Sequence, residues 1–182
     1  MARRSSGIRG EYERHGVQDY YAQRGADYRN PHEAAVQAAL AESVARWRLD
    51  LTSVLDLACG SGETTLALRG LGCQQVEGVD PYTGEAYRQR TGLFAAPFSF
   101  EQIAAGALEG RRYHLIVCSY ALHLLPESRL PLLCYHLSRL APALLILTPH
   151  KRPHLRPEWG WTLDDEIIVQ RVHCRLYTRQ PH

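Results

Sequence analysis

Short apolar runs alternate with helical patterns along most of this chain. Near-continuous apolar runs, typical of strands covered on both faces of a parallel sheet, occupy residues 53–58, 75–80, 113–119 and 143–148. A weaker strand pattern covers residues 94–98. Helical patterns fall at residues 31–49, 63–71, 83–89, 101–108 and 129–140. This alternation predicts an α/β fold with a doubly wound, mostly parallel sheet.

The C-terminal part of the chain has a different pattern. Two β-like runs, residues 163–169 and 171–177, are joined by at most a tight connection. They predict an antiparallel addition at the sheet edge. No helical pattern lies between residues 148 and 162, and no repeat or linker divides the chain. We therefore expect a single domain over residues 1–182, with a flexible arm (1–15), an N-terminal helical segment (16–49) and a sheet core (50–182).

Composition narrows the class of protein. The 182 residues are 45% hydrophobic and 22% charged, and the net charge is +2. These are values of an ordinary globular chain, and the charge is too small to imply a polyanionic partner. The sequence shows no secretory signal and no apolar stretch of membrane-spanning length, so a cytoplasmic protein without membrane contact is expected. The five cysteines have no C-x-x-C spacing, and no ligand spacing predicts a metal.

A Gly-rich turn carries the strongest functional signal. The first strand includes Asp56, then turns tightly through Gly60 and Gly62 and opens a helix. Glycine lets the backbone approach a ligand closely, and this turn would lie at the carboxyl ends of the strands, where ligands bind in such sheets. Asp80 follows 18 positions after Gly62, at the end of the second strand. An acid at that point can accept hydrogen bonds from two ribose hydroxyls.

A dinucleotide is the first ligand class to consider for such a turn. Its fingerprint, G-x-G-x-x-G, rests a pyrophosphate on the helix N-terminus. Here Thr65 stands at the position of the third glycine, and the anionic Glu63 in the first helical turn would repel a pyrophosphate. A ligand with an ammonium and a sulfonium cation suits Asp56 and Glu63 better.

Residues 54–65, 78–80 and 113–123 together resemble three motifs of the class I (seven-stranded, Rossmann-like) S-adenosylmethionine (SAM)-dependent methyltransferases. The resemblance covers about residues 50–150 and implies that family's fold, with an N-terminal helical lid. It also implies SAM as cofactor and S-adenosylhomocysteine as product. Ala58 replaces a frequent first glycine, and Ser99 stands where members often have an acid. The implied cofactor-binding residues are Asp56, Ala58, Gly60, Gly62, Asp80, Pro81, Tyr82, Ser99, Phe100 and Ser119.

The resemblance implies in-line transfer of the methyl group, with a base only where the acceptor must lose a proton. The candidates for that catalytic role are His123, His150 and Tyr21. His123 has a hydrogen-bonded structural role as its alternative. The basic stretch after the last parallel strand either binds an anionic acceptor or is a solvated loop. The candidate substrate-binding residues are Tyr20, Tyr28, His32, Tyr120, Lys151 and Arg152.

Three functions remain open from the sequence. A methyltransferase for a small-molecule acceptor is favoured. A nucleic-acid methyltransferase is the first alternative, although Ser119-Tyr120-Ala121-Leu122 replaces the Asn/Asp-Pro-Pro-Tyr motif of amino-adenine methylases and no Pro-Cys dipeptide occurs. A SAM-binding partner or regulatory protein without turnover is the second alternative. A monomer or a homodimer fits each of them.

Overall fold

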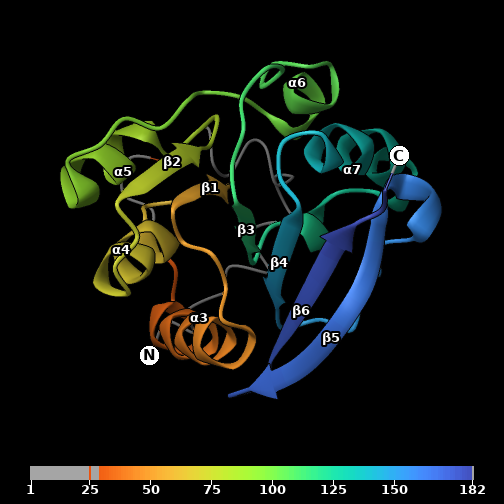
Figure 1. The fold of residues 1–182 in the computed structure, drawn as a ribbon. Coiled ribbons are helices and arrows are strands. Elements are labelled where there is room, and N and C mark those ends of the chain that lie inside the picture. The colour runs from red at the N-terminus through yellow and green to blue at the C-terminus, as the bar shows by residue number, and fades with distance from the viewer. Residues whose placement is uncertain (1–24, 26–28, 182) are drawn as a thin grey trace, which may run out of the picture.

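The sheet of this protein has six strands. The computed structural model describes residue 25 and residues 29–181, and its strand order is β2-β1-β3-β4-β6-β5 (Figure 1). The strands are β1 (Ser53–Leu57), β2 (Gln75–Val79), β3 (Leu115–Ser119), β4 (Ala143–Thr148), β5 (Trp161–Val169) and β6 (Val172–Arg179). The α-helices are α3 (Glu33–Trp47), α4 (Glu63–Gly70), α5 (Gly84–Thr91), α6 (Phe100–Ala104) and α7 (Leu130–Ser138). The described residues also include the 3-10 turns η2 (Leu122–Leu124), η3 (Glu127–Arg129) and η4 (Pro157–Trp159).

Strands β1 to β4 are parallel, and the C-terminal pair is antiparallel. β1 pairs with β2 on one side and with β3 on the other, and β3 pairs with β4. β6 pairs antiparallel with β4, and β5 pairs antiparallel with β6. The chain therefore reverses its direction of winding between β1 and β3. In doubly wound sheets the crevice at such a point, outside the carboxyl ends of the strands, is where ligands bind.

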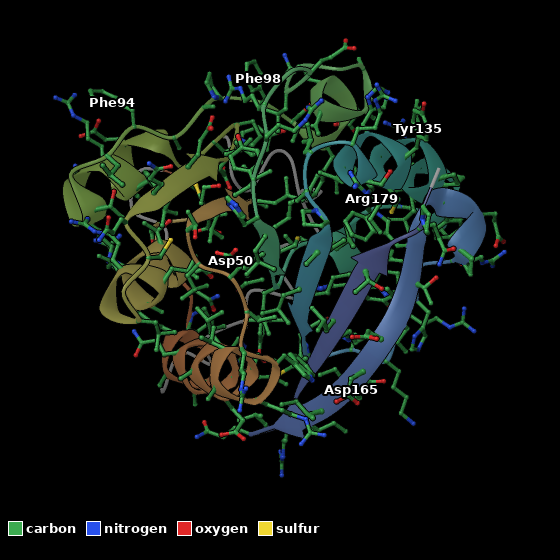
Figure 2. All side chains as sticks on the ribbon, in the orientation of Figure 1. Asp50, Phe94, Phe98, Tyr135, Asp165 and Arg179 are labelled. Atoms are coloured by element: carbon green, nitrogen blue, oxygen red, sulfur yellow. The ribbon has the colours of Figure 1, made fainter. Side chains whose placement is uncertain are left out.

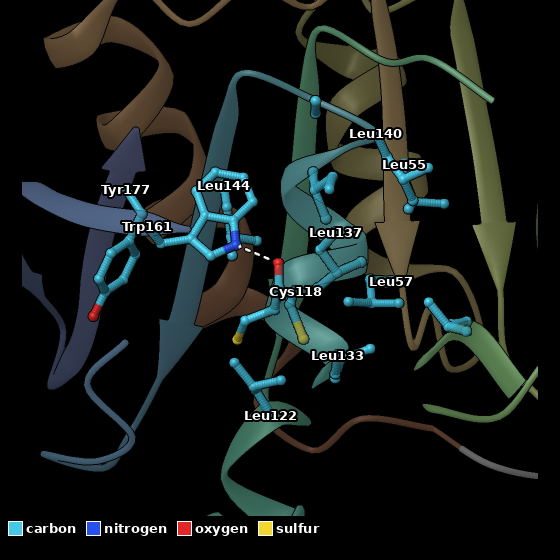
Figure 3. Close-up of a cluster of buried hydrophobic side chains, with 14 of the residues drawn as sticks. Leu55, Leu57, Cys118, Leu122, Leu133, Leu137, Leu140, Leu144, Trp161 and Tyr177 are labelled. Carbon is cyan, nitrogen blue, oxygen red and sulfur yellow. Dashed lines mark hydrogen bonds between the residues drawn. The ribbon is translucent and has the colours of Figure 1, made fainter. Parts of the chain in front are cut away.

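Alternate residues of the buried strands face opposite layers of helices, as the period of a strand requires. Leu55, Ile116 and Leu144 belong to a core cluster shared with α6 and α7 (Figure 3). Their chain neighbours Val54 and Leu115 belong to a second cluster shared with α3 and α4. Both faces of the sheet are thus covered, which explains why the strand sequences are near-continuous apolar runs.

The C-terminal hairpin is fastened to both helical layers. The indole of Trp161, fully buried in β5, donates a hydrogen bond of 2.9 Å to the Cys134 carbonyl in α7 (Figure 3). On the other face, Asp165 of β5 accepts hydrogen bonds from the Trp47 indole at 2.9 Å and from Arg46 at 3.2 Å, both in α3 (Figure 2). The predicted antiparallel addition is therefore confirmed, and it forms an integral part of the sheet.

The prediction of a strand at residues 94–98 is wrong. Only Ala96 pairs with the sheet, through an isolated parallel bridge to Val79. Phe94 stays 75% exposed and lies beside Arg88, whose guanidinium carbon is 4.7 Å from the ring centroid (Figure 2). Without a strand run around Ala96, the sheet ends at β2 on this side.

The helices differ from the sequence expectation mainly in length. The helix expected at residues 101–108 is the short α6, which a Ser99 capping box starts. Between β4 and β5 the described chain holds only the 3-10 turn η4, in agreement with the missing helical pattern there. In the described part of the chain, no helix has both the length and the apolar character needed to cross a membrane.

Candidate active site

The loop after β1 has a left-handed backbone at three of its five residues. The φ angles are 57° at Ala58, 55° at Gly60 and 93° at Gly62. Two backbone hydrogen bonds hold the loop: the Cys59 N–H donates to the Val79 carbonyl at 3.1 Å, and the Gly62 N–H donates to the Cys59 carbonyl at 2.9 Å. The alanine at position 58 accepts a backbone conformation that normally favours glycine.

Gly62 has a packing requirement of its own. A methyl group placed on Gly62 would lie 2.4 Å from Cγ2 of Thr91 and 3.2 Å from Cδ2 of Tyr87, both in α5. Gly78 in β2 faces the same Tyr87 ring, whose Cζ would lie 2.6 Å from an added methyl group. These two glycines therefore allow α5 to pack closely on the loop and on β2. The sequence suggested a backbone approach to the ligand for Gly62, and the structure adds this packing role.

Asp80 joins the two loops that the sequence motifs define. Its Oδ1 accepts hydrogen bonds from the N–H groups of Tyr82 at 2.9 Å and Thr83 at 3.0 Å. Its Oδ2 accepts one from the Gly60 N–H at 3.3 Å. Thr83 closes the connection, because its hydroxyl donates to the Gly60 carbonyl at 2.7 Å. Burial raises the pKa of the Asp80 carboxyl, and the hydrogen bonds that it accepts oppose this effect.

Asp56 lies beneath the loop and is only 1% exposed. Its Oδ2 accepts a hydrogen bond of 2.7 Å from the Thr65 hydroxyl, which also lies 3.0 Å from the Tyr87 hydroxyl. Burial raises the pKa of Asp56 to about 7, and the nearby charges of Glu63 and Asp80 add to this. In this structure the Asp56 side chain supports the loop from inside the protein.

Glu63, at the start of α4, is a second buried acid and is 4% exposed. Its Oε1 accepts hydrogen bonds from the Ser61 hydroxyl at 2.5 Å and from the Asn30 N–H at 3.0 Å. Arg90 of α5 lies 3.6 Å from the same oxygen and donates to Glu33 at 2.7 Å. We call these five residues the N-terminal clamp. The sequence suggested that Glu63 binds a cationic ligand. In the structure, the carboxylate of Glu63 interacts with partners within the protein.

Gly25 and Asn30, which precede α3, lie against the loop after β2 and the start of α4, whereas α3 itself covers the sheet. Gly25 is buried, and a methyl group placed on it would lie 2.2 Å from the carbonyl oxygen of Tyr82. Gly25 thus packs directly against the backbone of the loop that contains Pro81 and Tyr82. Of the expected lid, Tyr20, Tyr21 and Tyr28 lie outside the described residues.

The loop after residue 98 brings Ser99 and Phe100 to the start of α6. The Ser99 hydroxyl accepts a hydrogen bond of 3.3 Å from the Gln102 N–H, and the Gln102 side chain accepts one of 2.9 Å from the Ser99 N–H. Phe100 packs against the core cluster of α6 and α7. Both residues therefore have a structural role at this helix start.

The end of β3 contacts the N-terminal segment. Tyr120 follows Ser119, and its left-handed backbone, with a φ of 55°, donates from its N–H to the Leu147 carbonyl at 2.8 Å. The Tyr120 ring stacks on the His32 imidazole, with centroids 5.2 Å apart and an interplanar angle of 25°. The structure thus brings together two candidate substrate-binding residues that are far apart in sequence.

Two histidines meet beyond β3 and β4. The ring centroids of His123 and His150 are 4.4 Å apart, and Nδ1 of His123 lies 3.5 Å from the Thr148 hydroxyl. That hydroxyl also accepts a hydrogen bond of 3.2 Å from the His150 N–H. Burial, together with His150, lowers the pKa of His123 to about 4. His123 is therefore a neutral imidazole at pH 7.

A buried arginine holds the loop that carries His150. Arg175 of β6 is 1% exposed and donates to the carbonyls of His150 at 3.2 Å, Lys151 at 2.8 Å and Pro153 at 3.2 Å. Glu166 of β5 balances its charge at 3.1 Å. These hydrogen bonds from Arg175 fix the backbone of the loop, while the side chains of residues 150–152 are exposed.

Comparison with known proteins decides the family. A family model described as "Methyltransferase domain" matches residues 21–180. The chain belongs to this methyltransferase family. No group of three or more His, Cys, Asp or Glu residues within the described part of this methyltransferase could hold a metal ion.

Relatives of this methyltransferase cover nearly its whole length. The uncharacterized protein C17A5.05c of Schizosaccharomyces pombe is 32% identical, over 89% of this chain and 88% of its own. Magnesium protoporphyrin IX methyltransferase from Synechocystis PCC 6803, solved with bound SAM, has a TM-score of 0.64 at 18% identity, with 93% and 94% of the two chains covered. The CcbJ methyltransferase from Streptomyces caelestis has a TM-score of 0.66 at 12% identity, with 88% and 96% covered. The solved structures agree with the mostly parallel Rossmann-like fold.

Two features of this methyltransferase escaped the sequence analysis. The first is Arg175, whose signal is a charged residue among the buried positions 174–177 of an inner strand. The second is the N-terminal clamp, in which Glu63 and Arg90 link segments that are distant in sequence. Local patterns assign such residues to the surface, because their partners are visible only in three dimensions.

Proposed function

We propose that this methyltransferase uses SAM as methyl donor and methylates a small-molecule acceptor beside His123 and His150. The comparisons support this proposal through relatives of similar length. Magnesium protoporphyrin IX methyltransferase was solved both with SAM and with its demethylated product SAH. Magnesium protoporphyrin IX, the substrate in its name, is a small molecule, and the fold of that enzyme resembles this chain over nearly the full length of both.

The contact between Asp80 and Gly60 carries the proposal. It brings an acid at the end of β2 to 3.3 Å from the glycine loop after β1, at the carboxyl edge of the sheet. A vicinal diol can take the place of the Gly60 N–H as hydrogen-bond donor to the Asp80 carboxylate, since it offers two hydroxyls to the acid. The left-handed loop backbone places the Gly60 N–H against this acid. These residues fit a ligand that combines a ribose with a compact charged tail.

Chemistry at the acceptor needs little from the protein. SAM supplies a methyl group already activated on a sulfonium, so the enzyme contributes mainly proximity and alignment, effects worth roughly 7–11 kcal/mol. We assign Asp80 to the ribose, and the backbone at Ala58, Gly60 and Ser119 to the rest of the cofactor site. Neutral His123 accepts the proton of an acceptor that must lose one, and Thr148 and His150 orient its ring.

Calorimetry with SAM and with SAH tests the cofactor assignment. We expect both to bind the full chain, and we expect Asp80→Asn to weaken binding by about tenfold or more, since it removes a charged acceptor of hydrogen bonds. The asparagine keeps an oxygen that can accept from Tyr82 and Thr83, so the loop stays folded. Asp164→Asn, which changes an exposed acid in β5, serves as the matched control. Failure of both ligands to bind would overturn the proposal.

Turnover requires a second experiment. SAM with a radioactive methyl group is incubated with the protein and with separated small-molecule and RNA fractions of a cell extract. We expect label in the small-molecule fraction, and we expect His123→Asn to reduce it by roughly 10²-fold or more. Label that enters RNA would favour the nucleic-acid alternative. Tight SAM binding without any labelled product would favour a binding protein without turnover.

A further inference from the structure

A pocket of about 210 Å³ opens next to His123. One wall is formed by the segment after β3, from His123 to Leu130, and the other wall by residues 152–156 after β4. The pocket therefore begins at the imidazole that the proposed function places beside the acceptor. Its volume is smaller than the usual 300–1,000 Å³ of whole-ligand sites, so it suits one part of a small molecule.

The polar side of this pocket is cationic. Arg152 is exposed, and among the described residues it has no acidic partner. The single acid among the lining residues, Glu127, is paired with Arg156 at 2.9 Å. His154 lies on the same wall. Partial burial, with the positive charges of Arg175 and Arg152, lowers its pKa, so at neutral pH it offers an uncharged N–H or nitrogen lone pair. The pocket thus has one uncompensated guanidinium.

The other side of the pocket is apolar. Leu125 and Pro153 are half-buried and contribute aliphatic surface, and Leu130, which is only 1% exposed, lies behind them. Binding sites of this kind combine apolar walls with a few fixed polar groups that set orientation. An occupant with an apolar body and one charged end therefore matches both sides.

The backbone under Arg152 is preorganised. Arg175 donates to the carbonyls on both sides of Arg152, at Lys151 and at Pro153. A planar guanidinium recognises carboxylate and phosphate through paired hydrogen bonds. Since the loop backbone is fixed before binding, less conformational freedom is lost when the Arg152 side chain engages an anion.

We propose that the pocket between His123 and Arg152 binds an anionic group of the acceptor, a carboxylate or a phosphate attached to a small apolar body. This inference rests on the proposed function, because it places the acceptor of the methyl group in the pocket. Arg152 forms the ion pair, His154 contributes a hydrogen bond, and Leu125 and Pro153 contact the apolar part.

Three probes that share one ring test this charge class. Benzoate, phenyl phosphate and the uncharged benzamide are titrated into the full chain saturated with SAH, at pH 7.5 and constant ionic strength, and followed by calorimetry. We expect one of the two anions to bind at least about tenfold more tightly than benzamide. Preference between the anions identifies the source of the charge as carboxylate or phosphate. Equal affinity for all three probes, or no binding by any of them, would overturn the inference.

Two variants test whether the anionic probe binds in this pocket. Arg152→Gln is expected to abolish the preference for an anion, and its thermal unfolding should match that of wild type because the Arg152 side chain is exposed. Arg139→Gln removes the same charge from an exposed position outside the lining and should leave the preference intact. Anion binding that persists in Arg152→Gln would contradict the proposal. The SAH titration in the same samples tests the proposed function separately, since SAH can bind whether or not benzoate does.

Discussion

His123 and His150 face each other across 4.4 Å between their ring centroids, although one follows β3 and the other follows β4. The register of two neighbouring parallel strands brings them together, because Ser119 of β3 lies opposite Leu147 of β4. Two imidazoles at this distance cannot both be charged without mutual repulsion. Burial, together with His150, lowers the pKa of His123 to about 4, so the His123 imidazole is uncharged at neutral pH at the carboxyl edge of the sheet.

Acid should weaken the folded state through His123. Its pKa is lowered from the ordinary 6.5 to about 4 in the folded protein, so the unfolded chain takes up a proton first as pH falls. Stability from this group is complete above about pH 6.5 and is lost progressively toward pH 4. Urea unfolding at pH 7.5 and pH 5 should show a smaller loss in His123→Gln than in wild type. His136→Gln, in α7, is the control, and an equal loss in all three proteins would contradict the prediction.

The buried Asp56 should have the opposite pH dependence. Its pKa is raised from 3.8 to about 7, so the folded protein holds a proton that the unfolded chain releases, and stability falls as pH rises between these values. Asp56→Asn stays neutral and keeps an acceptor for the Thr65 hydroxyl. We expect this variant to be more stable than wild type by about 2–4 kcal/mol at pH 8.5, and the difference to shrink toward pH 4. Wild type that is equally stable at pH 8.5 would refute this.

A methyl group at Gly62 should be costly for two reasons that can be separated. The left-handed φ of 93° disfavours alanine, and the new Cβ would lie 2.4 Å from Cγ2 of Thr91. We expect Gly62→Ala to lower the free energy of unfolding by about 2–5 kcal/mol. Adding Thr91→Ser removes that methyl carbon and should recover about 1–2 kcal/mol. Gly70→Ala, with no atom within 4 Å of the added carbon, should be neutral or slightly stabilising.

Removing the buried guanidinium should release the His150 loop. Arg175→Gln leaves Glu166 without its cation and three loop carbonyls without a donor. The expected cost is about 3–5 kcal/mol of unfolding free energy, with methyl transfer reduced far more than SAM affinity. Arg179→Gln, an exposed change in the same strand, should stay within about 0.5 kcal/mol of wild type. Unchanged transfer by a folded Arg175→Gln protein would show that the loop does not need this support.

Most of the fold follows from local pattern, because buried parallel strands need apolar residues at every position. The runs that became β1 to β4 were predictable for this reason. The C-terminal hairpin, whose strand β5 is partly exposed, was predictable instead from two β-like runs joined by a tight connection. Residues 94–98 contain Phe94 and Phe98 and resemble a strand, yet only Ala96 is paired. An aromatic residue is compatible with a strand or with an exposed loop, and only its neighbours in space decide between them.

The residues of the candidate site that belong to sequence motifs were predictable. The residues that depend on tertiary contacts were not. Spacing located Asp80 and Gly60 correctly enough that they meet in the structure. It could not show that Glu63 points toward Asn30, nor that Arg175 lies under the His150 loop. Charged residues acquire such roles from partners more than 20 positions away, which no local pattern records.

The N-terminal clamp couples two events. Because Glu63 accepts from the Asn30 N–H next to the glycine loop, the free energy of seating the N-terminal segment is linked to the conformation of that loop. Linkage between two such equilibria is reciprocal. A cofactor that favours the ordered loop must strengthen the binding of the N-terminal segment by some factor. The bound segment must strengthen the binding of the cofactor by the same factor. The affinity for the cofactor is thereby set in part by residues that never contact the reacting atoms.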